Sequence, residues 1–283
     1  MDRKLIEKSS EIAEEIDASA LIVIPGEKEI EGLLEEKEYS FPIFIVTSPE
    51  KKYSGTHEEF KISARGETQN FAKQFQDAVM MAYVKGKVDV GDKIVGVGAI
   101  EDEATGILVY NVYEDPLLRS IHESTGRVGI DTMRAILDLA VEIGREGREG
   151  KAIGTAFVVG DSSEVMSRSH QLILNPYKCQ DDEVRDVKNH QNWETIKEFS
   201  QIDGVFILDE DGKILSAGRY LSVDSDEIDI PSGLGARHVA CASVSKETDA
   251  IVVSVAKSGG VVRMFKDGEI IGEVEPRVRI LPV

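Results

Sequence analysis

The sequence predicts an α/β protein of two domains, on two observations. First, short apolar segments alternate with amphipathic segments of helical spacing over residues 1–115. Buried strands separated by helices are typical of a mostly parallel sheet covered by helices. Second, the chain has 283 residues, a length that suits two ordinary domains. We expect residues 1–119 to form an N-terminal α/β domain and residues 120–283 to form the second domain.

Four apolar segments of the first domain predict buried strands. They are residues 20–26 (ALIVIPG), 41–48 (FPIFIVTS), 92–100 (DKIVGVGAI) and 106–113 (GILVYNVY). Apolar side chains that recur about every four residues predict helices over residues 5–16 and 69–85. No phosphate-binding glycine motif and no cluster of His with carboxylates occurs in this part. We therefore expect a structural or regulatory role. The pattern resembles the small C-terminal α/β domain of pyruvate kinase, including the pair Gly91–Asp92 before a strand.

The composition excludes several classes of function. Lys and Arg number 33 against 52 Asp and Glu, a formal charge of −19, which repels nucleic acids and anionic membranes. No apolar run reaches the roughly 20 residues that cross a bilayer, and the charged N-terminus is unlike a signal peptide. We expect a cytoplasmic protein. Cys179 and Cys241 match no metal or redox spacing, which predicts free thiols, with Cys241 in the core.

Residues 115–129 look like a connector, and Asp131 is expected to cap a helix that continues to Ile143. Beyond it, residues 154–161 predict a buried strand, and residues 203–221 predict a β-hairpin with its turn at Asp211 and Gly212.

The pair Asp203–Gly204 stands at the entrance of that hairpin and has two interpretations. It is either a simple turn, or a metal-binding carboxylate beside a glycine that lets a ligand approach the backbone.

A glycine-rich segment, residues 232–235, leads into a predicted helix that begins with Arg237 and His238. Free N–H groups and the positive end of the helix dipole at such a turn suit phosphate. Arg237 would add a fork of donors and His238 a metal ligand. Alternatively, His238 is a buried core histidine and Arg237 a surface residue. Residues 249–270 then predict two further strands around a Ser-Gly-Gly turn.

These segments, in this order, resemble the diadenylate cyclase (DAC, DisA-N) domain over about residues 125–275. An acidic α/β domain in front of such a domain is similar to the archaeal class of these cyclases. The resemblance implies a mixed central sheet flanked by helices in the second domain. It also implies condensation of two ATP molecules into cyclic di-AMP with release of two pyrophosphates.

The resemblance implies site residues position by position. The family's Asp-Gly-Ala motif matches Asp203, Gly204 and Val205, and its adenine-packing leucine matches Leu221. The approach to its Arg-His pair matches Leu234, Gly235 and Ala236, and the pair itself matches Arg237 and His238. All of these residues except Asp203 would bind ATP. Asp203 and His238 together would hold the metal. Asp203, Arg237 and His238 would carry the catalysis.

Three positions depart from the family's pattern. Val239 stands where the family has the second arginine of its Arg-His-Arg motif, and Ala236 replaces a hydroxyl residue. The family's acidic residue falls near Ala256 and Lys257. The phosphate contact of the missing arginine must therefore come from elsewhere or be absent.

The implied cofactor is a divalent metal, Mn²⁺ or Mg²⁺, with Co²⁺ a further candidate because of the histidine ligand. The implied partner is a second copy of the chain, because two ATP sites must face each other across a two-fold axis in a homodimer or a higher homo-oligomer. Two alternatives stay open. The same pocket could serve a non-catalytic sensor of adenine nucleotides or cyclic dinucleotides, or the second domain could be vestigial beside a functional N-terminal one.

Overall fold

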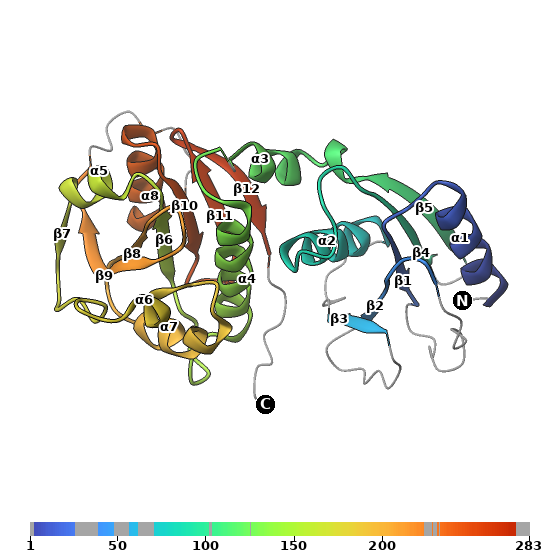
Figure 1. Ribbon diagram of the computed structural model, residues 1–283, viewed down its shortest axis with the longest axis horizontal. Helices are drawn as coiled ribbons and strands as arrows, with labels where there is room; N and C mark the ends of the chain where they lie inside the picture. The colour runs from blue at the N-terminus through green and yellow to red at the C-terminus, as the bar shows by residue number, and fades with distance from the viewer. Residues whose placement is uncertain are drawn as a thin grey trace. The chain divides into compact units, whose positions relative to one another are not determined.

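The computed structural model describes residues 3–25, 39–47, 57–61, 71–101, 104–124, 126–223, 228, 231 and 233–275. The chain divides into two compact units, Met1–Arg119 and Ser120–Val283. Each unit contains its own sheet with helices packed on it (Figure 1).

The N-terminal unit is built around a five-stranded sheet of order β3-β2-β1-β4-β5. Strands β1, β2, β3 and β4 pair in parallel, and β5 is an antiparallel edge strand. The elements are α1 (Arg3–Glu15), β1 (Ala20–Ile24), β2 (Ile43–Thr47), β3 (Glu58–Lys61), α2 (Phe71–Val84), β4 (Lys93–Glu101) and β5 (Ala104–Asn111).

The predicted mostly parallel sheet of this unit is confirmed. All residues of β1 and β2 are buried, as their unbroken apolar sequences predict. Strand β3 was not predicted, because its sequence EEFK contains a single apolar residue. That residue, Phe60, is buried and stacks on Phe44 of β2 with ring centroids 4.8 Å apart. A single apolar side chain is too short a signal for a strand, although here it is enough to anchor one.

Two expectations about the middle of the chain are wrong. The predicted connector, residues 115–129, contains the helix α3 (Pro116–Ser124), and a 3₁₀ turn η1 (Val112–Glu114) precedes it. Helix α4 (Ile130–Glu146) begins one residue before Asp131, with Gly129 at the capping position. Asp131 instead lies in the first turn, where its charge still favours the helix dipole.

The C-terminal unit contains a seven-stranded sheet of order β12-β11-β10-β6-β8-β9-β7. Only β6 and β8 pair in parallel, and the other neighbours are antiparallel. The predicted mixed sheet is therefore confirmed. The elements after α4 are β6 (Thr155–Val159), α5 (Ser162–Ser167), β7 (Ser169–Gln171), α6 (Asp182–Arg185), η2 (His190–Asn192), α7 (Trp193–Phe199), β8 (Val205–Leu208), β9 (Ile214–Leu221), α8 (Ala236–Glu247), β10 (Ile251–Val255), β11 (Val262–Lys266) and β12 (Glu269–Val274).

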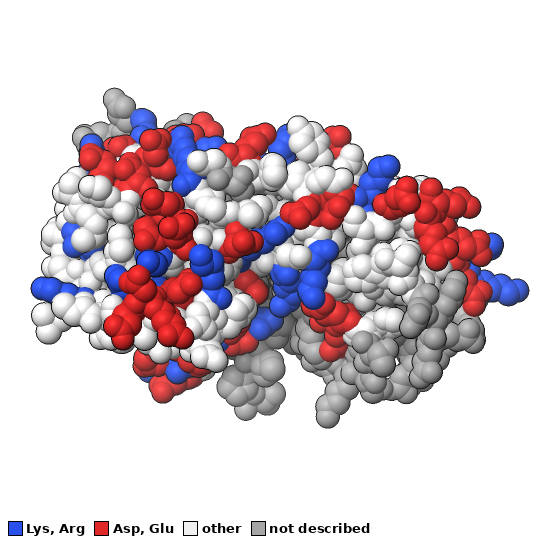
Figure 2. Space-filling view, in the orientation of Figure 1, with Lys and Arg blue, Asp and Glu red and all other residues white. Residues whose placement is uncertain are grey.

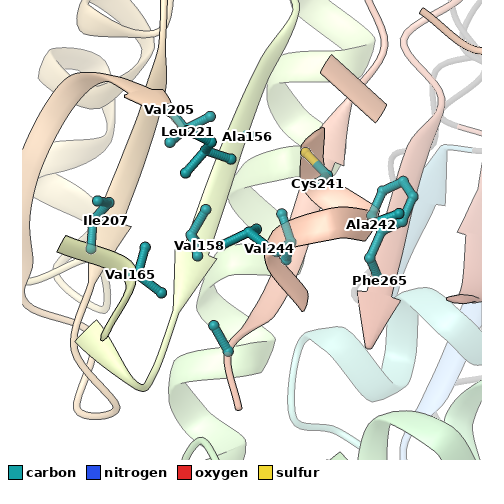
Figure 3. Close-up of a cluster of buried hydrophobic side chains, with 12 residues drawn as sticks. Ala156, Val158, Val165, Val205, Ile207, Leu221, Cys241, Ala242, Val244 and Phe265 are labelled. Atoms are coloured by element: carbon teal, nitrogen blue, oxygen red, sulfur yellow. The ribbon is translucent and has the colours of Figure 1, made fainter. Parts of the chain in front are cut away.

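Helices α8 and α4 both pack on this sheet (Figure 1). Alternate residues of β6 and β8 join side chains of α8 in one apolar cluster, which Figure 3 shows. Cys241 of α8 lies in this cluster and is fully buried, as predicted, and burial raises the pKa of its thiol to about 12. The face of the sheet under α8 is therefore a packed apolar floor.

Acidic side chains are spread over the face of the molecule that Figure 2 shows, as the net charge of −19 requires. Among the described residues, no helix is both long and apolar enough to span a bilayer.

Candidate functional site

The predicted site residues gather at one end of the C-terminal sheet, which we call the site end. Because β6 and β8 are parallel, both begin at this end, and the antiparallel β10 ends there. Strand β11 begins at the same end, since Val262 pairs with Val255. Helix α8 leads into β10 from the opposite end, so its N-terminus also lies at the site end. The tertiary structure thereby brings Asp203 and the Arg237–His238 pair to the same end of one sheet.

The Asp203–Gly204 pair forms the sharp bend that starts β8. Gly204 has φ +107°, and a Cβ atom there would lie 2.6 Å from the backbone nitrogen of Arg219 on β9. A residue with a side chain would meet both a strained backbone and a collision. Asp203 precedes this bend and is exposed. The close β8–β9 approach therefore requires the glycine, and it presents the carboxylate of Asp203 to solvent.

The N-terminus of α8 carries no side-chain cap among the described residues. Gly235 is the capping residue, and Gly235 and Ala236 are exposed, with Leu234 half-buried before them. A helix of this length presents unpaired N–H groups and a partial positive charge at its start. The binding of phosphate at this end of α8 stays a prediction.

Arg237 lies against the backbone at the start of β6. A Cβ atom on Gly154 would stand 2.8 Å from Nη1 of Arg237 and 3.0 Å from the backbone nitrogen of Lys257. The absence of a side chain at Gly154 therefore makes room for the guanidinium group. Within the described part of the chain, no carboxylate is paired with Arg237.

His238 is half-buried and lies in positive surroundings. Its Nε2 atom is 3.5 Å from Nη1 of Arg263 on β11. Burial lowers the pKa of His238, the charges of Arg263 and Arg237 lower it further, and Glu273 opposes them. The imidazole is therefore neutral at neutral pH. Its Nδ1 atom is buried without a hydrogen-bond partner in the described structure.

Arg263 is the functional candidate that sequence analysis missed. Its side chain is only 14% exposed, and its Nε donates to Oε2 of Glu273 on β12 at 2.8 Å. In the sequence Arg263 stands in an ordinary strand, VRMFK, and a basic residue in such a strand is usually interpreted as facing solvent. The available signal was the alternation of side chains between the two faces of a strand, which puts Arg263 on the same face as the buried Phe265.

Val205, expected to bind ATP, and Leu221, expected to pack on the adenine, lie in the apolar cluster under α8. They are 4% and 6% exposed, and Figure 3 shows them together beside Ala156. Val205 follows Gly204 directly, and Leu221 ends the neighbouring strand β9. They form the apolar floor next to the site end, with little surface open to a ligand.

The described residues contain no group of three or more His, Cys, Asp and Glu side chains that could hold a metal ion. The cationic neighbours of His238 do not favour a metal there, whereas Asp203 is an exposed carboxylate. Mg²⁺ is commonly held by one or two carboxylates together with substrate phosphates. The donor set thus fits a divalent ion that Asp203 shares with a phosphorylated ligand.

Comparison with protein families assigns both units. Residues 142–270 match the model of the DAC domain, described as DisA bacterial checkpoint controller nucleotide-binding. Residues 4–113 match a probable sensor domain, DacZ_A. The likeness of residues 1–119 to pyruvate kinase stays a prediction.

Two curated proteins, both called diadenylate cyclase, are similar in sequence. The protein from Methanocaldococcus jannaschii is 47% identical over 191 residues, 66% of this chain and 60% of that protein. The protein from Haloferax volcanii is 34% identical over 212 residues, 74% of this chain and 77% of that protein. The chain therefore belongs to the diadenylate cyclase family, and it resembles archaeal members, as the sequence predicts.

Among solved structures, the chain matches a hypothetical membrane spanning protein from Bacillus cereus, and the match covers 55% of this chain and 70% of that chain. The TM-score is 0.41 and the sequence identity is 14%.

Proposed function

We propose that this chain is a diadenylate cyclase that converts two ATP molecules into cyclic di-AMP and two pyrophosphates. Residues 120–283 would form the cyclase domain, and residues 1–119 a regulatory unit. The observation that carries the proposal is the open N-terminus of α8. There, Arg237 has no carboxylate partner in the described chain, and the site end also presents Asp203. Membership of the diadenylate cyclase family supports the choice of nucleotide.

The proposed reaction makes and breaks one bond at each α-phosphorus. The 3′-oxygen of one ATP forms a bond to the α-phosphorus of the other, and the bond from that phosphorus to the bridging oxygen of the β-phosphate breaks. Pyrophosphate leaves with the bond electrons, and the proton of the 3′-hydroxyl passes to solvent. Transfers of this kind depend mainly on positioning and charge neutralisation.

Each candidate residue has a role that its surroundings support. The guanidinium of Arg237 and the free N–H groups at Gly235 and Ala236 would hold the triphosphate. Leu234, Gly204 and the apolar pair of Val205 and Leu221 would border the nucleoside.

Asp203 would hold the divalent ion together with phosphate oxygens. Such an ion, when bound, lowers the pKa of an attacking hydroxyl and neutralises phosphate charge. His238 as its second ligand stays a prediction, and the two guanidinium groups beside it favour a place on the phosphate side instead. Whether the ion is Mg²⁺, Mn²⁺ or Co²⁺ is a question for the assay.

The chemistry requires two copies, because one ATP site cannot supply both nucleophile and acceptor. The segment after β7 supports a contact surface near the site end. Its side chains Leu172, Ile173 and Leu174 are 46%, 40% and 94% exposed. Ile173 lies against Gly218, which itself lies beside the backbone of Asp203. Exposed apolar side chains next to the site would suit a second copy that brings its own ATP.

The decisive experiment is incubation of the purified chain with ATP and Mg²⁺ or Mn²⁺, with products separated and weighed by mass spectrometry. We expect cyclic di-AMP and pyrophosphate, with a specific activity that falls on dilution if two copies must meet. Asp203→Asn should lower the rate about a hundredfold or more, because metal-assisted stabilisation amounts to several kcal/mol. Asp211→Asn is the matched control, since Asp211 precedes a glycine at the opposite end of the same hairpin.

Two results would contradict this proposal. ATP binding without any cyclic product under each metal would support the nucleotide sensor. Equal activity of wild type and Asp203→Asn would keep the reaction and remove the role of Asp203.

A further inference from the structure

We propose that Arg263 is a phosphate-binding residue of the ATP site, and that it supplies from β11 the second guanidinium group that position 239 lacks. The inference rests on the proposed function in that the ligand is ATP. Val239 follows His238 in the sequence, so no second arginine can come from the helix itself. Arg263 comes from 25 residues further along the chain and contacts the same histidine.

The strand register places Arg263 under the N-terminal part of α8. Arg263 pairs with Ser254 of β10, and Ser254 pairs with Ala156 of β6. Directly opposite residues of neighbouring strands point to the same face of a sheet. Ala156 belongs to the apolar cluster that α8 covers, so Arg263 lies on that face too. Arg237 and Arg263 therefore flank His238, one from the helix and one from the sheet.

We call Arg237, His238 and Arg263 the α8 cluster. Among the described residues, one carboxylate contacts this cluster: Glu273 accepts from Nε of Arg263, and Nη1 of Arg263 lies toward His238. Like charges that are partly buried repel each other, and an anion near both guanidinium groups would offset that repulsion.

The contact with Arg263 also bears on the tautomer of His238. A guanidinium group only donates hydrogen bonds, so this contact favours the tautomer in which Nε2 of His238 accepts and Nδ1 carries the proton. Its buried Nδ1 and the hydroxyl of Ser254, on the same face of the sheet, have no partner in the described structure. A bound ligand would give these unpaired polar atoms partners.

The test is equilibrium binding to the full-length chain, measured by calorimetry. The two probes are α,β-methylene-ATP, which cannot release pyrophosphate, and adenosine, which has no phosphate. Arg263→Ala should weaken binding of the ATP analogue about tenfold or more, as expected for the loss of a charge-assisted contact, and leave adenosine binding within twofold. Lys266→Ala is the matched control, because it removes a positive charge from the far end of the same strand and should affect neither probe.

A second variant covers loss of folding. If circular dichroism or thermal unfolding shows that Arg263→Ala is not folded, Arg263→Lys decides. That variant keeps the charge and loses the fork of donors, so it should weaken the analogue at least threefold without weakening adenosine.

The inference is overturned if either folded variant binds the ATP analogue as tightly as wild type does. It is also overturned if either variant loses affinity for the analogue and for adenosine equally, which would indicate a structural role. Wild type that binds the analogue but makes no cyclic di-AMP would refute the cyclase and leave the role of Arg263 to the same comparison. Wild type that does not bind the analogue would overturn both proposals.

Discussion

Lys197 and the α8 cluster both place positive charge inside the C-terminal unit, but their surroundings differ. Lys197 is 4% exposed, and its ammonium group contacts Glu142, Glu146 at 3.3 Å and Glu194 at 2.9 Å. Burial lowers the pKa of Lys197, yet the hydrogen bonds and charges of these carboxylates outweigh burial and raise it above its usual value. Three acids around one base form a complete structural group.

The α8 cluster has the opposite balance. Its two arginines have one described carboxylate between them, and its histidine is neutral with an unpaired nitrogen. Removing one partner of a buried ion group destabilises the fold, whereas a charge without a partner can be neutralised by a ligand. Stability and nucleotide affinity should therefore separate when the two places are mutated.

The largest effect on stability is expected at Lys197. Lys197→Ala removes the cation that Glu142 contacts, while Glu146 and Glu194 keep Arg145 and Arg148 as partners, so the free energy of unfolding should fall by about 1 to 3 kcal/mol. Urea unfolding followed by circular dichroism measures this change. Binding of α,β-methylene-ATP to the folded variant should stay as in wild type.

The control for this variant is Lys213→Ala. Lys213 pairs with Asp182 at 2.6 Å on the surface, so Lys213→Ala should lower the free energy of unfolding far less than Lys197→Ala does. Equal losses for both lysines would mean that burial of Lys197 does not matter.

The next effect is expected at Arg237 and has the opposite character. Arg237→Ala should weaken binding of α,β-methylene-ATP about tenfold to a hundredfold, because a charge-assisted contact to phosphate is lost. Its melting temperature should be equal to or above that of wild type, because one of two like charges beside His238 is gone. A clear loss of stability without loss of affinity would reverse the assignment of Arg237.

The smallest effect is expected at Gly154, which sharpens the comparison without removing any charge. In Gly154→Ala the new Cβ would displace Nη1 of Arg237, now 2.8 Å from that position. We expect a loss of analogue affinity of roughly threefold to tenfold. Gly126→Ala, in open space in the same unit, is the control and should bind as wild type does.

Much of the architecture follows from local sequence patterns. The unbroken apolar segments predict β1, β2 and β6 as buried strands, and the Asp211–Gly212 turn predicts the β8–β9 hairpin. The glycines before Arg237 predict where α8 begins. These features depend on neighbours within a few residues, so the sequence shows them directly. Strand β3 was not predicted because it depends on the packing of Phe60 against Phe44 of β2.

The sequence by itself therefore determined most of the buried strands, the acidic character and the residue types offered for chemistry. The tertiary structure alone decided which of those residues meet. Arg263 reaches His238 only because β10 and β11 pair in the register that sets Arg263 opposite Ser254. A slip of one residue would turn it to the other face of the sheet. Contacts across strands depend on that register, which no local pattern around Arg263 records.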